Sequence, residues 1–371
     1  MASMANRVAH LGTSVFTEIN ELALKHKAVN LGQGKPDFDA PPDVVARAVE
    51  AMKDGVHNQY APDKGIASLR KAVADHAGRF YNMDIDPAQG VVVTSGASEG
   101  IFAAILGLAD FGDEVIVIEP YFDLYLPAIT MTGAIPVYVP LHPPSWTFDP
   151  DELRAAFTPK TRVLLLNTPH NPTGRVLEVE ELELLAAACR EHDVTVITDE
   201  VYEHLIYEGR HVPMATLPGM AQRTLTISSL GKTHSVTGWK TGWATGPAEL
   251  VGALRAVKQF LTFAGGTPFQ VAAADGLAID PAPLTASLRE RRDRLAAGLE
   301  EAGFAVLDTQ GTYFLNAALP GEQPPPALKL IQIEGHDQSP VFLRYSASRR
   351  RRLHRRHAPF GFNLCPHDAQ R

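Results

Sequence analysis

Two lysines, Lys232 and Lys240, lie eight positions apart in the segment SSLGKTHSVTGWKTGW (228–243). The serines, threonines and glycines around them are too small and polar for an ordinary hydrophobic core. A lysine that is shielded from water, or placed beside another cation, becomes an amine nucleophile that can form a Schiff base with an aldehyde. The segment alone also allows the other interpretation, in which both lysines are solvated surface charges.

Two further polar segments offer groups that can hold a phosphate or line a small-molecule site. TSGASEG (94–100) places Ala97 and Ser98 in a small-residue loop that opens a helix, where free backbone N–H groups bind phosphates. NTPHNPTG (167–174) is rich in Asn and Pro and contains Asn171. Each segment also fits an ordinary helix start or turn, so neither defines a site by itself.

An acidic residue and a tyrosine follow another apolar run, in TDEVYEH (198–204). Asp199 ends the run and Tyr202 comes three positions later, and an Asp here can also simply cap the next helix. A cofactor with an aldehyde, a phosphate and a ring nitrogen needs an amine, a phosphate site and a carboxylate. Lys232, the 97–98 loop and Asp199 offer these three groups.

Short β-rich runs separated by helical patterns must position these residues. The runs cover residues 90–96, 113–120, 134–141, 161–169, 194–200 and 223–229. The alternation predicts an α/β fold whose central sheet is mostly parallel and is sandwiched by helices. In such sheets ligands bind beyond the carboxyl ends of the strands, where Asn171, Asp199 and Lys232 all fall. A long charged helical segment followed by strands, at 286–319, predicts a smaller α+β domain.

Six motifs resemble, in this order along the chain, the pyridoxal-phosphate-dependent aminotransferases of class I/II, which have fold type I. They are VNLGQGKPDF, NQYAPDKGIASLR, VIEPYFDLY, NTPHNPTGRV, VITDEVYEHL and SSLGKTHSVTGWKTGWATGP. The resemblance covers about residues 10–316 and is closest to the kynurenine/glutamine, methionine and N-succinyldiaminopimelate aminotransferase branch. It implies an enzyme that moves an amino group from an amino acid to a 2-oxo acid, with pyridoxal 5'-phosphate (PLP) as cofactor.

The resemblance implies a separate role for each lysine. Lys232 would hold the cofactor as a Schiff base and then move a proton at the substrate Cα, whereas Lys240 and Ser229 would bind the phosphate. Asp199 would pair with the pyridine nitrogen, and the catalytic residues would be Lys232, Asp199 and Tyr202. The two lysines would then be close in sequence because they hold opposite ends of one small molecule.

Further cofactor contacts follow from the same resemblance. Asn171 and Tyr202 would hydrogen-bond the ring hydroxyl, Phe122 would stack on the ring, and Ala97 and Ser98 would contact the phosphate.

The resemblance also implies one cofactor contact from a neighbouring subunit and a set of substrate contacts. Tyr60 resembles a tyrosine that contacts the phosphate of the neighbouring subunit, which implies a homodimer with shared active sites. Phe16 would lie at the substrate entrance, and Gly34 and Asn171 would contact the substrate carboxylate. Arg344 superficially resembles the arginine that binds this carboxylate with two hydrogen bonds.

The resemblance also suggests how the chain divides. We expect an N-terminal arm with part of the small domain at 1–44, a large PLP-binding domain at 45–275, and the start of the small domain at 276–316. Lys35 departs from the branch, which more often carries Phe at this position. It is either a solvated charge or a cation that favours an acidic substrate.

The segment 317–371 departs most from the family pattern. Arg344 comes only 30 residues after Phe314, too soon for the helix and strands that usually intervene. A run of Arg, His and Pro without helical or strand periodicity predicts a truncated or disordered tail. Out-of-frame translation of a GC-rich gene and a nucleic-acid-binding tail are the alternatives.

Charge and composition narrow the class of protein. The net charge is −8, but residues 1–340 carry 26 basic and 41 acidic side chains, a balance of −15, which disfavours nucleic acid as a partner. Cys189 and Cys365 make neither a disulfide framework nor a metal cluster, so no metal site is expected. No apolar run approaches a membrane span, and MASMANRVAH lacks a secretory apolar stretch. We therefore expect a cytoplasmic enzyme with no nucleic-acid or membrane partner.

Two alternatives to an aminotransferase remain open. A cysteine-conjugate C–S β-lyase uses the same cofactor chemistry but eliminates at Cβ. A catalytically impaired PLP-binding protein would keep the large domain and lack the C-terminal substrate clamp. A nicotinamide-dependent dehydrogenase is set aside, because no G-x-G-x-x-G motif follows the first strand.

Overall fold

The computed structural model describes residues 38–318 without a break. Towards the ends it also describes residues 4–5, 7–9, 11–12, 15–27, 30, 327–332 and 344–347. Only the backbone is described for residues 15–16, 327–332 and 344–347.

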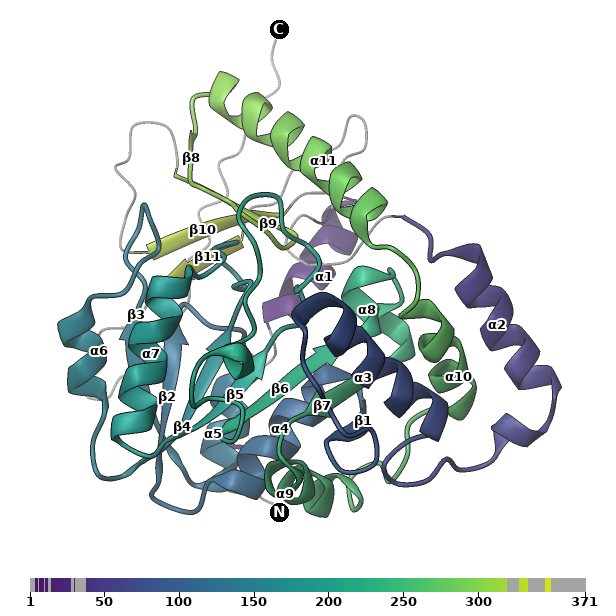
Figure 1. The fold of residues 1–371 in the computed structure, drawn as a ribbon. Helices are drawn as coiled ribbons and strands as arrows, with labels where there is room; N and C mark the ends of the chain where they lie inside the picture. The colour runs from purple at the N-terminus through teal and green to yellow at the C-terminus, as the bar shows by residue number, and fades with distance from the viewer. Residues whose placement is uncertain are drawn as a thin grey trace, which may run out of the picture.

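A seven-stranded sheet with the order β1–β7–β6–β5–β4–β2–β3 forms the centre of the molecule (Figure 1). Its strands are β1 (Val91–Ser95), β2 (Glu114–Glu119), β3 (Ile135–Pro140), β4 (Thr161–Asn167), β5 (Thr195–Asp199), β6 (Thr224–Ser229) and β7 (Thr241–Thr245). All neighbours from β3 to β6 are parallel, whereas β7 is antiparallel to both β6 and β1. The six predicted strands and the mostly parallel sheet are confirmed. The sequence does not predict β7, because TGWAT has no apolar run or alternation.

Helices cover both faces of this sheet, as the predicted sandwich requires. On one face, Val115 and Val117 belong to a core shared with α4 (Gly96–Leu108), α5 (Tyr125–Thr132) and α9 (Ala248–Lys258). Ile116 and Ile118, which alternate with them, pack on the other face with α6 (Pro150–Ala156) and α7 (Val179–Glu191). This period-two alternation buries both faces of the strands.

A third cluster lies at the β1 end of the sheet. It joins β1 and β7 to α2 (Pro42–Lys53), α3 (Ala67–Tyr81) and α10 (Thr267–Gly276). The remaining short elements are η1 (Val56–Asn58), η2 (Met214–Thr216), α8 (Leu230–Thr233) and η3 (Thr237–Trp239). At the N-terminal side the structure also describes α1 (Val15–His26).

A second, four-stranded sheet with the order β11–β10–β9–β8 lies beside the central one (Figure 1). Its elements are β8 (Ala305–Val306), β9 (Phe314–Ala318), β10 (Ala327–Gln332) and β11 (Arg344–Ala347), preceded by α11 (Ala282–Glu301). Leu295 and Leu299 of α11 pack against Leu315 of β9. The predicted charged helix followed by strands is therefore present. β10 and β11 fall within 317–371, and the predicted domain limits stay a prediction.

Local signals explain where several helices begin. The Asp149 carboxylate accepts hydrogen bonds from the N–H groups of Asp151 and Glu152 at the start of α6. Glu178 and Glu181 form a reciprocal capping box at the start of α7. Within the described parts of the chain, no helix has both the length and the apolar character needed to cross a membrane.

Candidate active site

The carboxyl ends of β4, β5 and β6 bring the predicted site residues to one edge of the central sheet. Asn167 ends β4 and is the register partner of Asp199, which ends β5. The Asn167 side chain donates a 2.7 Å hydrogen bond to the Asp199 carbonyl and accepts one of 2.7 Å from the Asn171 N–H. This amide therefore joins the 167–174 turn to the end of β5.

Lys232 lies in α8, directly after β6. Its Nζ is 5.4 Å from the ring centre of Tyr202 and 5.8 Å from that of Tyr313. Burial lowers the pKa of Lys232 to about 8, while the charge of Asp199 opposes this change and that of Lys240 adds to it. A substantial fraction of such an amine is neutral near pH 7 to 8, the form that attacks an aldehyde.

Asp199 is the buried acid of the site, with 5% of its surface exposed. Burial raises its pKa to about 6, against hydrogen bonds that favour the ionised form. The Tyr125 hydroxyl donates to its Oδ2 at 2.8 Å, and the Val201 N–H donates to its Oδ1 at 3.4 Å. With pKa values near 6 and 8, Asp199 carries a negative charge at neutral pH and Lys232 retains much of its positive charge.

A compact glycine-rich cradle lies at the start of α4. The Lys240 Nζ donates a 3.3 Å hydrogen bond to the Ser98 Oγ. A Cβ on Gly96 would lie only 2.9 Å from that Nζ, and a Cβ on Gly242 would lie 2.6 Å from the Gly96 carbonyl carbon. The positive φ of 72° at Gly96 also requires glycine. A cation and the first N–H groups of a 13-residue helix therefore meet here, an arrangement suited to an anion.

The other predicted residues in the described chain lie around these two centres. The Tyr202 ring is 2% exposed and meets Tyr313 edge-on at 5.7 Å. The ring centre of Phe122 lies 5.7 Å from that of Tyr125, with the two rings edge-on. Phe122 packs against the core that α4, α5 and α9 share with the sheet. Ser229 is the residue before α8 and is the register partner of Gly242.

The substrate-side predictions are mostly outside the described residues. Gly34 and Lys35 lie in an undescribed range, and Phe16 and Arg344 are described only by backbone, in α1 and β11. Tyr60 is 86% exposed and meets the Phe263 ring edge-on at 5.9 Å.

Three site residues were not identified from the sequence. Tyr125 is buried at 2% exposure and contacts Asp199 directly, and its signal was its position three residues after Phe122 in EPYFDLY. The Tyr313 hydroxyl donates to the carbonyl of Lys232. Asn167 resembles any strand-ending polar residue until its two hydrogen bonds are seen.

The donor groups of the site fit pyridoxal phosphate. An amine, a buried carboxylate and a cationic glycine cradle correspond to the aldehyde, the ring nitrogen and the phosphate of this cofactor. The tight Gly96–Gly242 approach supports the fit, because a side chain at either position would fill the cradle.

Comparison with known proteins gives the same family. The family model for aminotransferase class I and II matches residues 26–335. The chain is 52% identical over 320 residues to the probable N-succinyldiaminopimelate aminotransferase of Mycobacterium tuberculosis, covering 84% of this chain and 80% of the relative. It is 40% identical over 335 residues to human kynurenine–oxoglutarate transaminase 1, covering 84% and 79%.

The solved structures agree with the sequence relatives. The N-succinyldiaminopimelate aminotransferase of Mycobacterium tuberculosis superposes with a TM-score of 0.83 at 51% identity, over 85% of this chain and 83% of that one. A Thermus thermophilus aspartate aminotransferase with maleate gives 0.81 at 33% identity, over 85% of each chain. The chain belongs to the class I and II aminotransferases, the pyridoxal-phosphate-dependent transaminases of fold type I.

Proposed function

We propose that the substrate pair of this transaminase is N-succinyldiaminopimelate and a 2-oxo acid. The observation that carries this choice is the 52% identity to the N-succinyldiaminopimelate enzyme, against 40% to the Escherichia coli methionine aminotransferase and 40% to the human kynurenine enzyme. The donor carries more carboxylates than methionine or kynurenine. Lys35, placed next to Gly34 in the sequence, adds a cation that suits such a donor.

The roles of the amine and the acid follow from their environments. When bound, pyridoxal phosphate supplies an aldehyde that captures an amino group and a ring that withdraws electrons. Lys232 would hold the aldehyde carbon and, once displaced by the donor, move the proton from the substrate Cα through its neutral amine. Asp199 would hold the ring nitrogen in its protonated form, and its ionised state at neutral pH supports this role.

The remaining cofactor residues would fix the ring and the phosphate. Asn171 and Tyr202 would hydrogen-bond the ring hydroxyl, and Phe122 would stack on one ring face. The phosphate would be held by Ser229, Lys240 and the Ala97–Ser98 start of α4, and the existing Lys240–Ser98 hydrogen bond supports this assignment.

Substrate contacts are proposed from the family resemblance. Phe16 would line the entrance, and Gly34 and Asn171 would contact the donor carboxylate. Arg344 would bind the same carboxylate, and the position of β11 at the edge of the second sheet is compatible with this role.

We further propose a homodimer with shared active sites. Tyr60, Phe260, Leu261 and Phe263 are exposed apolar side chains, at 86%, 85%, 51% and 44%. They lie beside the phosphate cradle, because Thr262 donates a 2.5 Å hydrogen bond to Glu99 in the first turn of α4. A second subunit would cover this surface and bring its Tyr60 to the cradle. Light scattering should give the mass of two chains, and a location in the cytoplasm stays a prediction.

Steady-state kinetics with several donors tests the substrate assignment. With 2-oxoglutarate as acceptor, kcat/KM should be at least about 10-fold higher for N-succinyldiaminopimelate than for methionine or kynurenine. Lys35→Phe should reduce kcat/KM for N-succinyldiaminopimelate and leave the value for methionine unchanged. Equal or higher kcat/KM with methionine would refute the assignment.

The same preparation distinguishes the alternatives. Release of pyruvate from a β-substituted cysteine faster than any transamination would identify a C–S β-lyase. Retention of PLP without turnover of any donor would identify an impaired cofactor-binding protein.

A further inference from the structure

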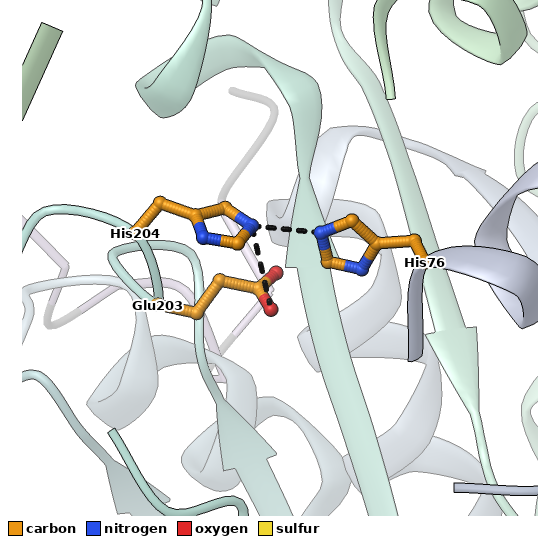
Figure 2. Close-up of side chains that lie close together, drawn as sticks. All are labelled: His76, Glu203 and His204. Atoms are coloured by element: carbon orange, nitrogen blue, oxygen red, sulfur yellow. Dashed lines mark hydrogen bonds and ion pairs between the residues drawn. The ribbon is translucent and has the colours of Figure 1, made fainter. Parts of the chain in front are cut away.

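Two imidazoles and one carboxylate lie close together in the folded chain (Figure 2). His76 comes from α3, whereas Glu203 and His204 come from the turn after β5. The two His Nε2 atoms are 2.7 Å apart, and the His204 Nε2 lies 4.0 Å from the Glu203 Oε2. All three groups offer a ligand atom within 4.8 Å of the others. The sequence gives no hint of this cluster, because His76 and His204 are 128 positions apart.

These side chains are the ligand types that zinc prefers. Two imidazole nitrogens and one carboxylate oxygen form a common three-ligand zinc set, in which a water takes the fourth position. A nitrogen-to-nitrogen contact of 2.7 Å leaves room for only one proton between the rings, so at least one nitrogen presents a lone pair. Two ligand atoms on one tetrahedral zinc lie roughly 3.3 Å apart. Ion binding therefore requires the two rings to separate by about 0.6 Å and the Glu203 Oε2, which lies 4.0 Å from the His204 Nε2, to approach by a similar distance.

Neighbouring hydroxyl groups hold the Glu203 carboxylate in place, as is typical of a carboxylate that binds a metal ion. Tyr81 donates a 2.6 Å hydrogen bond to the Glu203 Oε2, and Ser228 donates a 2.7 Å hydrogen bond to Oε1. Hydrogen bonds of this kind orient ligating carboxylates. The Phe80 ring packs against both imidazoles, at 4.8 Å from His76 and 4.5 Å from His204.

His234, a histidine with one ring nitrogen unpaired among the described residues, lies next to the cluster. His76, Glu203, His204 and His234 line one cavity of about 10 Å³, close to the size that holds a single water. His234 is 5% exposed, and its Nδ1 has no hydrogen-bond partner among the described residues. A buried polar atom without a partner is uncommon in a folded protein. A metal-bound water would satisfy this nitrogen.

We propose that His76, Glu203 and His204 form a binding site for a divalent ion of the zinc class, with a water that bridges the ion to His234. The site joins three segments, two of which also carry predicted catalytic residues. Glu203 and His204 directly follow Tyr202, His234 comes two residues after Lys232, and His76 lies within α3. The bound ion fixes the turn that carries Tyr202 against α3 and raises the thermal stability of the folded state.

Cobalt and zinc titrations of the tag-free, PLP-loaded full chain test this proposal. After treatment with a chelator, the protein should bind one Co²⁺ with the visible bands of a four-coordinate ion, and added Zn²⁺ should displace it and raise Tm. His204→Gln and His76→Asn should each weaken binding by at least about 10-fold. His142→Gln is the matched control. His142 is half exposed, and its Nε2 lies 2.7 Å from the Glu152 Oε2, a contact as short as the one between His76 and His204.

The variants also distinguish metal binding at this site from metal binding by other side chains of the chain. His354, His357, His367 and Cys365 lie near the C-terminus and can bind metal ions by themselves. Binding to wild type that His204→Gln and His76→Asn leave unchanged would overturn the proposal, as would a wild type that binds no ion. The absorption of bound PLP reports folding of each variant, so that if one substitution prevents folding the other still decides the outcome.

Discussion

The Tyr125 hydroxyl donates a 2.8 Å hydrogen bond to the Oδ2 of Asp199, and both residues are almost fully buried. The bond stabilises the ionised carboxylate and so opposes the increase in pKa that burial causes. It also fixes the carboxylate at the end of β5. In the proposed site, Tyr125 would therefore be a positioning residue that acts on the cofactor ring through Asp199.

Removal of this hydroxyl should shift the pH dependence of the enzyme. Tyr125→Phe should raise the pKa of Asp199 above its value of about 6 and move the acid limb of the kcat profile to higher pH. A hydrogen bond to a charged group contributes about 1.5–3 kcal/mol, so we expect kcat to fall by about 10-fold to 100-fold. Tyr138→Phe, at a partly exposed ring of β3, is the control. An acid limb that stays in place would show that Tyr125 has no such role.

Lys232→Ala should remove the covalent attachment and the proton transfer together. The variant should show no visible absorption band of lysine-bound PLP, and its kcat should fall by at least about 10⁴-fold, because both nucleophile and general base are lost. Lys71→Ala, at an exposed lysine paired with Asp75, should leave spectrum and kcat unchanged. Substantial turnover by Lys232→Ala would refute the assignment of the nucleophile.

Substitutions at the proposed phosphate site should change the affinity for PLP rather than the rate of the chemical step. Lys240→Met should raise the dissociation constant of PLP by about 10-fold to 100-fold, since it removes a charge-assisted hydrogen bond to a dianion. Ser98→Ala should have a smaller effect in the same direction. Fluorescence titration of the cofactor-free protein measures both, with Lys64→Met, at a lysine bonded to the Ala88 carbonyl, as the control. Unchanged affinity in Lys240→Met would contradict the phosphate role.

The parts of this fold that could be predicted are those that depend on short, continuous stretches of the sequence. Continuous apolar runs such as VTVITDE define buried parallel strands, and the polar residue that ends each run, such as Asp199, must lie at the binding edge of the sheet. Lys232 and Lys240 were identified because the six motifs of the chain resemble, in order, those of the aminotransferase family, whereas their segment alone also allowed two solvated surface charges.

The parts that could not be predicted depend on contacts between distant segments. Tyr125 meets Asp199 across 74 positions, and a tyrosine in an apolar helix resembles ordinary core until that contact is seen. Strand β7 has neither an apolar run nor an alternating pattern, and only its pairing with β1 and β6 makes it a strand. The His76–His204 contact likewise exists only in the folded chain.

The buried charge of Asp199 should cost stability when the cofactor is absent. Burial raises its pKa from 3.8 to about 6. Below about pH 4 the group is protonated in both the folded and the unfolded state. Between about pH 4 and pH 6 the unfolded state loses this proton while the folded state keeps it, so stability falls as pH rises through this window. The loss is complete above about pH 6 and amounts to about 3 kcal/mol.

Asp199→Asn removes this titration while keeping an oxygen that accepts from Tyr125. Relative to wild type, the cofactor-free variant should therefore become more stable as the pH increases from about 4 to 6, by up to about 3 kcal/mol. Urea unfolding at a series of pH values measures the difference, with Asp84→Asn, at an exposed carboxylate, as the control. A difference that stays constant across this window would mean that Asp199 has the same pKa in both states. The variant should still bind PLP, yet transaminate poorly, because a neutral amide cannot keep the ring nitrogen protonated.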